Sequence, residues 1–123
     1  MTEAEFKQRT KQAGLRAIRV VEALPRSLAA DVLGKQLIRC GTSVGANYRS
    51  ACRARSTADM IAKLAIVEEE ADESIYWLEM IVESKLFAKP RLGNLMAEFE
   101  EILAMVVASQ RTLRRNNPKP RAR

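Results

Sequence analysis

Apolar residues recur at steps of three, four and seven in four separate stretches of the chain. This spacing places side chains on one face of a helix. It predicts helices at about residues 3–24, 28–53, 57–85 and 92–114. Because the connections between these stretches are short, consecutive helices should pack side by side and run antiparallel. The pattern therefore predicts an all-α protein in which residues 1–114 form an antiparallel up-down four-helix bundle.

The second stretch shows this pattern clearly. Leu33, Leu37 and Cys40 follow steps of four and three, which are typical of a helical-bundle seam. Three glycines lie inside the same predicted helix, at Gly34, Gly41 and Gly45. Their spacing either admits close approach of a neighbouring helix or is simply tolerated within a well-packed bundle. The sequence leaves these two interpretations equally open.

Proline and capping residues mark the predicted turns. Pro25 ends the first helix, because proline cannot donate a backbone hydrogen bond and restricts the residue before it. Ser56 followed by Asp59 resembles a capping box at the start of the third helix. Pro90 predicts a turn before the fourth helix. Residues 115–123 are basic, contain two prolines and have no apolar face, so we expect a flexible tail.

Composition agrees with a helical protein. Aromatic residues make up 5% of the chain, and glycine (5) and proline (4) are scarce. No apolar run approaches the roughly 20 residues that span a bilayer, so we expect a cytoplasmic protein without membrane contact. Cys40 and Cys52 lie on one predicted helix, about 18 Å apart at its rise per residue, which is too far for a disulfide. Both should be free thiols.

The sequence offers little for catalysis. Histidine, the commonest general base and metal ligand, is absent. No glycine-rich phosphate loop, nucleophile elbow or Cys-x-x-Cys motif occurs. We therefore expect a non-enzymatic protein with no catalytic residue, no metal site and no cofactor.

Charge is segregated along the chain. Residues 1–58 carry 11 Lys and Arg against 4 Asp and Glu, whereas residues 59–105 carry 4 against 11. Residues 106–123 carry 6 basic residues and no acidic ones. Basic blocks around an acidic middle can bind a polyanion, a second copy of the chain, or both.

The basic blocks supply the candidate nucleic-acid-binding residues, whose cations can contact phosphates without reading base sequence. The alternative is ordinary solvated charge, partly paired with the acidic third helix. The candidates are Lys7, Arg9, Lys11, Arg16, Arg19, Arg49, Arg53, Arg55, Arg111, Arg114 and Arg115.

Three polar residues fall on the seams of the second and third helices. An antiparallel turn near residue 55 places Ser43 and Asn47 roughly opposite Glu68. A buried amide facing a carboxylate must be hydrogen-bonded, because an unpaired buried polar group costs about 1–3 kcal/mol. We interpret Ser43, Asn47 and Glu68 as a polar layer that fixes helix register, in preference to a catalytic group.

A second surface candidate surrounds the single tryptophan. Glu73, Trp77 and Met80 share one helical face, and Tyr76 lies beside them. Large aromatic residues and methionine are enriched at subunit contacts. The alternative is a tryptophan that covers the rim of its own bundle. We predict an oligomer interface at Glu73, Tyr76, Trp77 and Met80.

Two separated blocks carry a resemblance to a known family. They are Ser43-Val44-Gly45-Ala46-Asn47-Tyr48-Arg49 and Glu70-Ala71-Asp72-Glu73-Ser74-Ile75-Tyr76-Trp77-Leu78. In these blocks the chain resembles the four-helix-bundle family of 23S rRNA intervening-sequence proteins, which includes the accessory variability determinant of diversity-generating retroelements. The resemblance implies a ring, typically a homopentamer, without known catalysis. For the retroelement members it implies a basic surface that associates with RNA and with a reverse transcriptase.

The residues and the resemblance together lead to two hypotheses. In the first, this is an oligomeric accessory protein that binds RNA or DNA through basic helix faces and the tail. In the second, it is a protein–protein adaptor or structural ring whose charge blocks serve only self-assembly.

Overall fold

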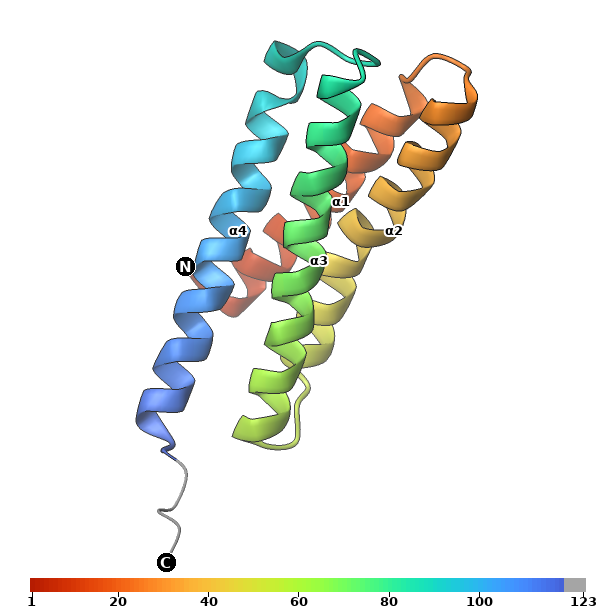
Figure 1. Cartoon of the computed structure of the whole chain (residues 1–123). Coiled ribbons are helices and arrows are strands. Elements are labelled where there is room, and N and C mark those ends of the chain that lie inside the picture. Colours follow the sequence, from red (N-terminus) through yellow and green to blue (C-terminus); the bar gives the residue numbers. More distant parts are fainter. Residues whose placement is uncertain (119–123) are drawn as a thin grey trace, which may run out of the picture.

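Four helices account for nearly all of the described chain. In this computed structural model, which describes residues 1–118, they are α1 (Glu3–Glu22), α2 (Leu28–Ala51), α3 (Thr57–Glu83) and α4 (Lys89–Asn116). Consecutive helices run antiparallel in an up-down bundle, as Figure 1 shows. The predicted fold class is confirmed. Most of the basic tail expected at 115–123 lies outside the described residues.

Side-chain caps start the first three helices. Thr2 Oγ1 accepts from the Glu5 backbone N–H (3.1 Å), while the Glu5 carboxylate accepts from the Thr2 backbone N–H (3.3 Å). Ser27 and Ser56 accept in the same way from backbone N–H groups three residues further on (both 3.0 Å). These bonds satisfy donors that a helix N-terminus otherwise leaves unpaired.

The fourth helix begins earlier than the position of Pro90 suggests. It starts at Lys89 instead of Leu92, with Pro90 inside its first turn. Proline is favoured there because its missing N–H would have no partner in the first turn and its fixed φ already suits a helix. Pro90 is therefore part of the helix start and not of the turn.

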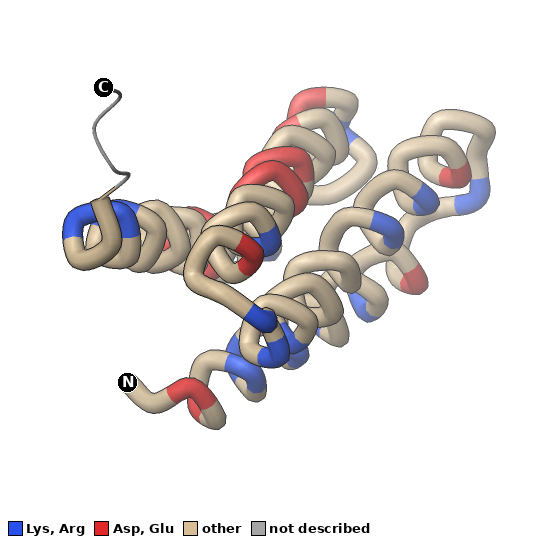
Figure 2. The backbone as a smooth tube through the Cα atoms, turned by 90° about the horizontal axis from the view of Figure 1, so that it is seen from below, with Lys and Arg blue, Asp and Glu red and all other residues tan. Residues whose placement is uncertain are grey.

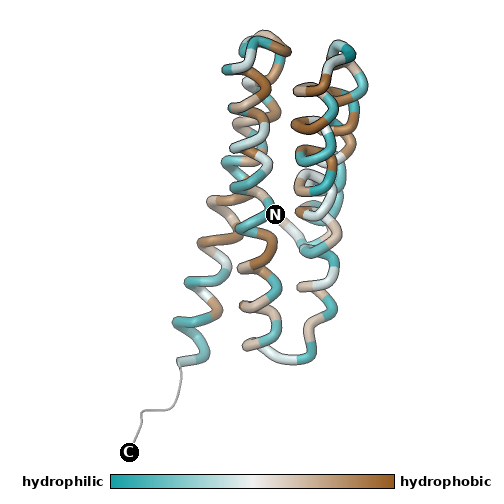
Figure 3. Tube along the Cα trace, turned by 45° about the vertical axis from the view of Figure 1, so that its right-hand side comes forward, coloured by the Kyte–Doolittle hydropathy of each residue, from teal (hydrophilic) through white to brown (hydrophobic). Residues whose placement is uncertain are grey.

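The core follows the seams that the apolar pattern predicts. Leu37, Leu64, Leu78, Phe99 and Ile102 are at most 1% exposed. Apolar positions recur between hydrophilic ones along each helix (Figure 3). Helix α2 packs against both α1 and α3, and α3 packs against α4, whereas α1 and α4 approach each other much less extensively. The bundle is thus weakest in apolar packing where its first and last helices meet.

Glycines bring α1 and α2 into near contact of their backbones. A Cβ atom on Gly14 would lie 3.2 Å from the carbonyl oxygen of Gly41, and one on Gly45 would lie 3.3 Å from the backbone nitrogen of Lys11. Such distances leave no room for a side chain without moving a backbone. Of the two open interpretations, the structure selects close helix approach for Gly41 and Gly45.

Candidate nucleic-acid interface

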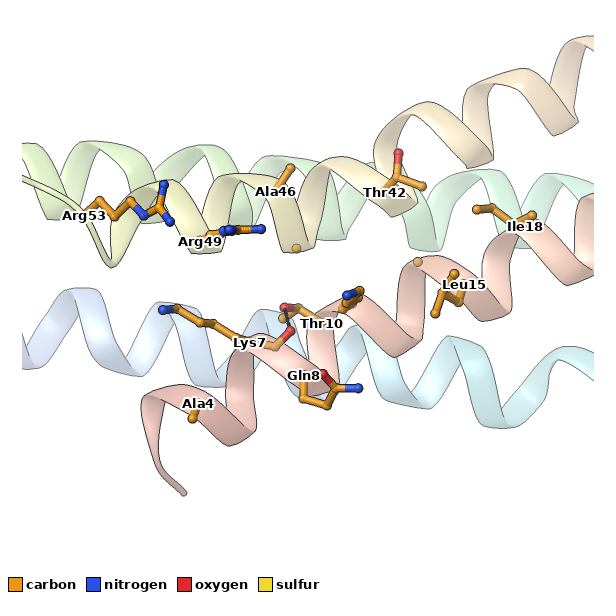
Figure 4. A pocket seen from close by; sticks show the side chains of 13 residues that line it. Ala4, Lys7, Gln8, Thr10, Leu15, Ile18, Thr42, Ala46, Arg49 and Arg53 are labelled. Atoms are coloured by element: carbon orange, nitrogen blue, oxygen red, sulfur yellow. Dashed lines mark hydrogen bonds between the residues drawn. The ribbon is translucent and has the colours of Figure 1, made fainter.

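A groove of about 570 Å³ runs along the outer side of the α1–α2 contact, and we call it the α1/α2 groove (Figure 4). Its cationic lining consists of Lys7, Lys11, Arg49 and Arg53. The close glycine contacts fix the register of its walls, because they place Gly45 beside Lys11 and Gly41 beside Gly14. Continuing this antiparallel register by one turn brings Lys7 opposite Arg49. Two basic pairs from different parts of the sequence therefore line one concave surface.

Few acidic side chains of the protein pair with the cations that line the groove. Within residues 1–118, Lys11, Arg49 and Arg53 form no salt bridge, and no Asp or Glu lines the groove. Lys7 pairs with Glu3 (3.3 Å), but both side chains are about half exposed, at 40% and 58%. An exposed pair of this kind contributes little. Lys7 and Lys11 are like charges four residues apart on α1, which is destabilising in the absence of an anion. Arg49 and Arg53 add two more cations at and just beyond the end of α2.

The wider charge distribution agrees with this local picture. Figure 2 shows Lys and Arg recurring along α1 and α2, while α3 carries a run of Asp and Glu. The basic block of the sequence thus becomes a basic side of the bundle, with the groove within it. A basic side of this kind is one to which polyanions can be attracted at long range, because cations can neutralise phosphates.

Arg9 does not belong to this interface, and its assignment to nucleic-acid binding is at odds with the contacts it makes. Its guanidinium binds Glu98 of α4 through Nε and Nη2, each 2.7 Å from a carboxylate oxygen, and it also bonds Glu101. The hydrogen bonds and charges of these carboxylates raise the pKa of Arg9, and the bond from Arg9 in turn lowers the pKa of Glu98. Because α1 and α4 meet so sparsely, this cluster fastens the open seam of the bundle. The charges of α1 alone do not reveal which of its cations points toward α4.

The other predicted basic residues lie outside the groove. Arg16 is half-buried, and the remaining ones are exposed on α1, in the α2–α3 turn or on the last turns of α4. They are Arg16, Arg19, Arg55, Arg111, Arg114 and Arg115. The structure brings four of the eleven candidates together and leaves these six dispersed.

The predicted polar layer has different hydrogen bonds from the ones expected. The Asn47 amide donates to the Ser43 carbonyl of its own helix (2.9 Å). Glu68 instead accepts from the side-chain amide of Gln110 on α4 (2.7 Å), and Gln110 is only 3% exposed. The expected bond between Asn47 and Glu68 was wrong because Glu68 lies toward α4 instead of α2. Gln110 was not singled out, since an isolated Gln on a helix gives no signal of burial.

The residues around Trp77 form part of the surface between α2 and α3. Glu73 accepts a 2.7 Å bond from Arg39 of α2, which also reaches Glu70 (3.5 Å). Tyr76 is 52% exposed and Met80 37%, and the Tyr76 ring lies edge-on to the half-buried Trp77 ring. The Trp77 Nε1–H is buried and has no hydrogen-bond acceptor within residues 1–118.

Neither cysteine is among the residues that line the α1/α2 groove within the described part of the chain. Cys40 and Cys52 are free thiols, and burial raises the pKa of each. Within residues 1–118, no group of three or more Cys, Asp or Glu residues is arranged to hold a metal ion. No helix in this part of the chain is both long and apolar enough to cross a membrane.

Comparison with known proteins decides the family. The sequence profile described as "23S rRNA-intervening sequence protein" matches residues 2–108. The chain belongs to this family. Its fold is also similar to a crystal structure of a protein of unknown function from the S23 ribosomal protein family of Bacteroides thetaiotaomicron. The two share 30% identity with a TM-score of 0.83, over 90% of this chain and 99% of that one. A search of curated proteins finds no match.

Membership of the 23S rRNA-intervening sequence family accounts for the bundle, and the groove adds residues that sequence reasoning missed. Leu15, Ile18, Thr42 and Gln8 line it beside the cations. The available signal was the glycine pattern, because Gly14 on one helix and Gly41 on the next indicate where two backbones meet. Without the register of that contact, these four residues read as ordinary surface positions of two separate helices.

Proposed function

We propose that this protein is a non-enzymatic RNA-binding protein that holds phosphates in the α1/α2 groove. The observation that carries the proposal is the convergence of Lys7, Lys11, Arg49 and Arg53 on one groove, whose lining within residues 1–118 includes no acidic residue. Clustered like charges lower stability unless an anion joins them. A phosphate backbone supplies anions at regular spacing, and its affinity comes from this sequence-independent neutralisation.

The remaining groove chemistry supports binding over catalysis. The hydroxyl of Thr10 donates to the Lys7 carbonyl (3.0 Å), and that of Thr42 donates to the Ile38 carbonyl (2.6 Å). Neither hydroxyl has a neighbouring carboxylate in the lining that could act as its base, and the chain has no histidine. A nucleophile without a base is a weak candidate for covalent catalysis. The resemblance to the retroelement members, whose basic surface associates with RNA, favours RNA over DNA as the polyanion.

A binding experiment with charge-matched variants tests the proposal. One variant carries Gln at Lys7, Lys11, Arg49 and Arg53, and the control carries Gln at four exposed cations away from the groove, Arg26, Lys35, Lys85 and Lys89. Both lose the same charge. Fluorescence anisotropy with a labelled RNA should show binding weakened at least tenfold by the groove variant and much less by the control. Equal weakening by both variants would show that only net charge matters and would contradict the proposal.

Self-association is a second candidate function, because apolar side chains are exposed on the surface that α2 and α3 share. Arg39 meets Glu73 across the α2–α3 boundary. Val32 lies two turns from Arg39 and Met80 two turns from Glu73, toward the same end because the helices are antiparallel. Val32 (51% exposed), Tyr76 and Met80 therefore share a face, which we call the α2/α3 face. We propose that copies of the chain meet there, in a ring of five as the family resemblance implies.

Light scattering distinguishes this face from assembly by charge. The native chain should give the mass of an oligomer at both low and high salt, because apolar contacts are not screened. Tyr76→Glu combined with Met80→Glu should reduce the mass to that of a monomer, whereas Glu at the exposed Leu15 on α1, away from this face, should not. An oligomer that dissociates in high salt would favour the alternative in which basic and acidic blocks hold the ring together. A monomer under all conditions would exclude both.

A further inference from the structure

Resting on the proposed function, we infer that the α1/α2 groove takes single-stranded RNA and discriminates against duplex RNA. Phosphates lie at its cationic end, and an unpaired base lies at its aliphatic end. This adds a substrate class to the site, since phosphate attraction alone acts on single strands and duplexes alike.

The first step is that the groove has two chemically different ends. Along α1 its lining changes from Lys7 and Lys11 to Leu15 and Ile18, a length of about 16 Å at the helical rise per residue. On the other wall it changes from Arg53, just beyond the end of α2, and Arg49 to Ala46 and Thr42. Figure 4 shows the basic side chains of both helices at one end of the groove and Leu15 and Ile18 at the other. A ligand that fills the groove must therefore carry anionic groups at one end and an apolar surface at the other. The two parts must lie at least about one nucleotide step apart.

The second step concerns what an RNA offers to such a groove. A-form duplexes keep their base faces stacked inside and present phosphates and 2′-hydroxyls, so a duplex has nothing for the aliphatic end. Unpaired nucleotides expose base faces that pack on side chains. The groove volume of about 570 Å³ lies in the range of ligand pockets and suits a few nucleotides, not a double helix.

The third step is that the groove has suitable contacts for a base even though it has no aromatic residue. Leu15 is 37% exposed and Gln8 is exposed, so both are accessible. At the cationic end, the Gln8 amide has no hydrogen-bond partner within residues 1–118 and can bond a 2′-hydroxyl of the same strand. Tyr48 is not available for stacking, because its ring packs edge-on against Phe6 at 4.6 Å between centroids.

An acidic peptide is the competing occupant and fits less well. Peptide helices that bind grooves insert large side chains into hydrophobic pockets. Here the floor consists of closely packed backbone at Gly14 and Gly45, and only Leu15 and Ile18 supply aliphatic side chains of any size. The floor is therefore shallow, which suits a flat base better than a bulky anchor residue.

Fluorescence anisotropy at physiological salt with three labelled probes tests the inference: a 10-nucleotide unpaired RNA, a 10-base-pair RNA duplex and an acidic decapeptide. The single strand should bind at least tenfold more tightly than either other probe. Leu15→Asn should weaken single-strand binding several-fold while leaving duplex binding unchanged. Leu28→Asn, at an exposed position at the far end of α2, should change neither.

Each contrary result has a separate meaning. If single strand and duplex bind equally and both depend on Lys7, Lys11, Arg49 and Arg53, the inference is overturned and the proposed function stands. If the peptide binds as tightly as the single strand, the choice of RNA as occupant is overturned. If neither RNA responds to these four cations while the variants remain folded by circular dichroism, the proposed function itself fails.

Discussion

Arg9 of α1 holds Glu98 of α4 through two parallel hydrogen bonds of 2.7 Å across the sparsest seam of the bundle. The two side chains are 23% and 17% exposed, so water competes weakly for them. Bidentate arginine–carboxylate pairs are among the stronger polar contacts in proteins. This pair connects the first and last helices where apolar packing is least extensive.

Removing either partner should destabilise the protein. We expect Arg9→Gln to lower the free energy of unfolding by about 1–3 kcal/mol, because it leaves the partly buried Glu98 carboxylate without its partner. Glu98→Gln should cost less, because Arg9 keeps its bond to Glu101. The double variant should lose less than the sum of the two. Lys7→Gln is the control, since its exposed pair with Glu3 is worth at most about 0.5 kcal/mol. Urea unfolding measures all four, and additive effects at Arg9 and Glu98 would show that the pair is uncoupled.

The same pair makes stability depend on acid pH. The bond from Arg9 lowers the pKa of Glu98 in the folded state. A depressed carboxyl pKa contributes stability that is present above the unfolded value, about 4.3, and is lost as pH falls through the folded value. The deficit of Glu98→Gln relative to the native chain should therefore be largest near pH 7 and shrink below about pH 4. Urea unfolding across this range checks it, and a deficit that does not change with pH would contradict the assignment.

Close backbone packing at Gly45 gives opposite expectations for two glycines. Gly45→Ala places a Cβ about 3.3 Å from backbone atoms of Thr10 and Lys11, which cannot rotate away. The helices must separate, so we expect a loss of about 1 kcal/mol or more despite the better helix propensity of alanine. Gly93→Ala on α4 meets nothing within 4 Å and should gain up to about 1 kcal/mol. Thermal unfolding of both variants tests this, and a Gly45→Ala protein as stable as Gly93→Ala would exclude tight packing.

Gln110 and Glu68 should behave as one polar unit between α3 and α4. Gln110→Leu keeps the volume but removes the only donor to Glu68 among residues 1–118, so stability should fall by about 1–3 kcal/mol. Replacing both residues with Leu removes the unpaired carboxylate and should recover most of that loss. If the double variant is less stable than Gln110→Leu alone, the loss in Gln110→Leu does not come from leaving the Glu68 carboxylate unpaired, and the prediction is contradicted.

The periodic pattern predicted the four helices because each one buries a continuous apolar stripe, from Leu33 and Leu37 on α2 to Leu78 on α3. Helix ends were less predictable, since Pro90 suits a turn and a first helical turn equally well. The four basic groove residues were recognisable as charges, but their convergence depends on how α1 and α2 are aligned. That alignment is set by Gly14, Gly41 and Gly45. The pattern left the role of Gly41 and Gly45 open and did not single out Gly14.

Charge alone could not separate Arg9 from Lys7 and Lys11. All three lie within the first turns of one helix, and their roles differ because Arg9 faces α4 and the two lysines face α2. Which neighbour a side chain faces is a tertiary property. Glu98 and Glu101, three residues apart on the fourth helix, were the available sign that a cation is held there.

The salt dependence of RNA binding tests the central claim most directly. On single strands, the logarithm of the binding constant falls against the logarithm of salt concentration with a slope of about −0.7 for each phosphate neutralised. If Lys7, Lys11, Arg49 and Arg53 contact phosphates, replacing all four with Gln should make that slope shallower by about 3. The charge-matched control at Arg26, Lys35, Lys85 and Lys89 should keep the native slope. A groove variant with the native slope would contradict the account.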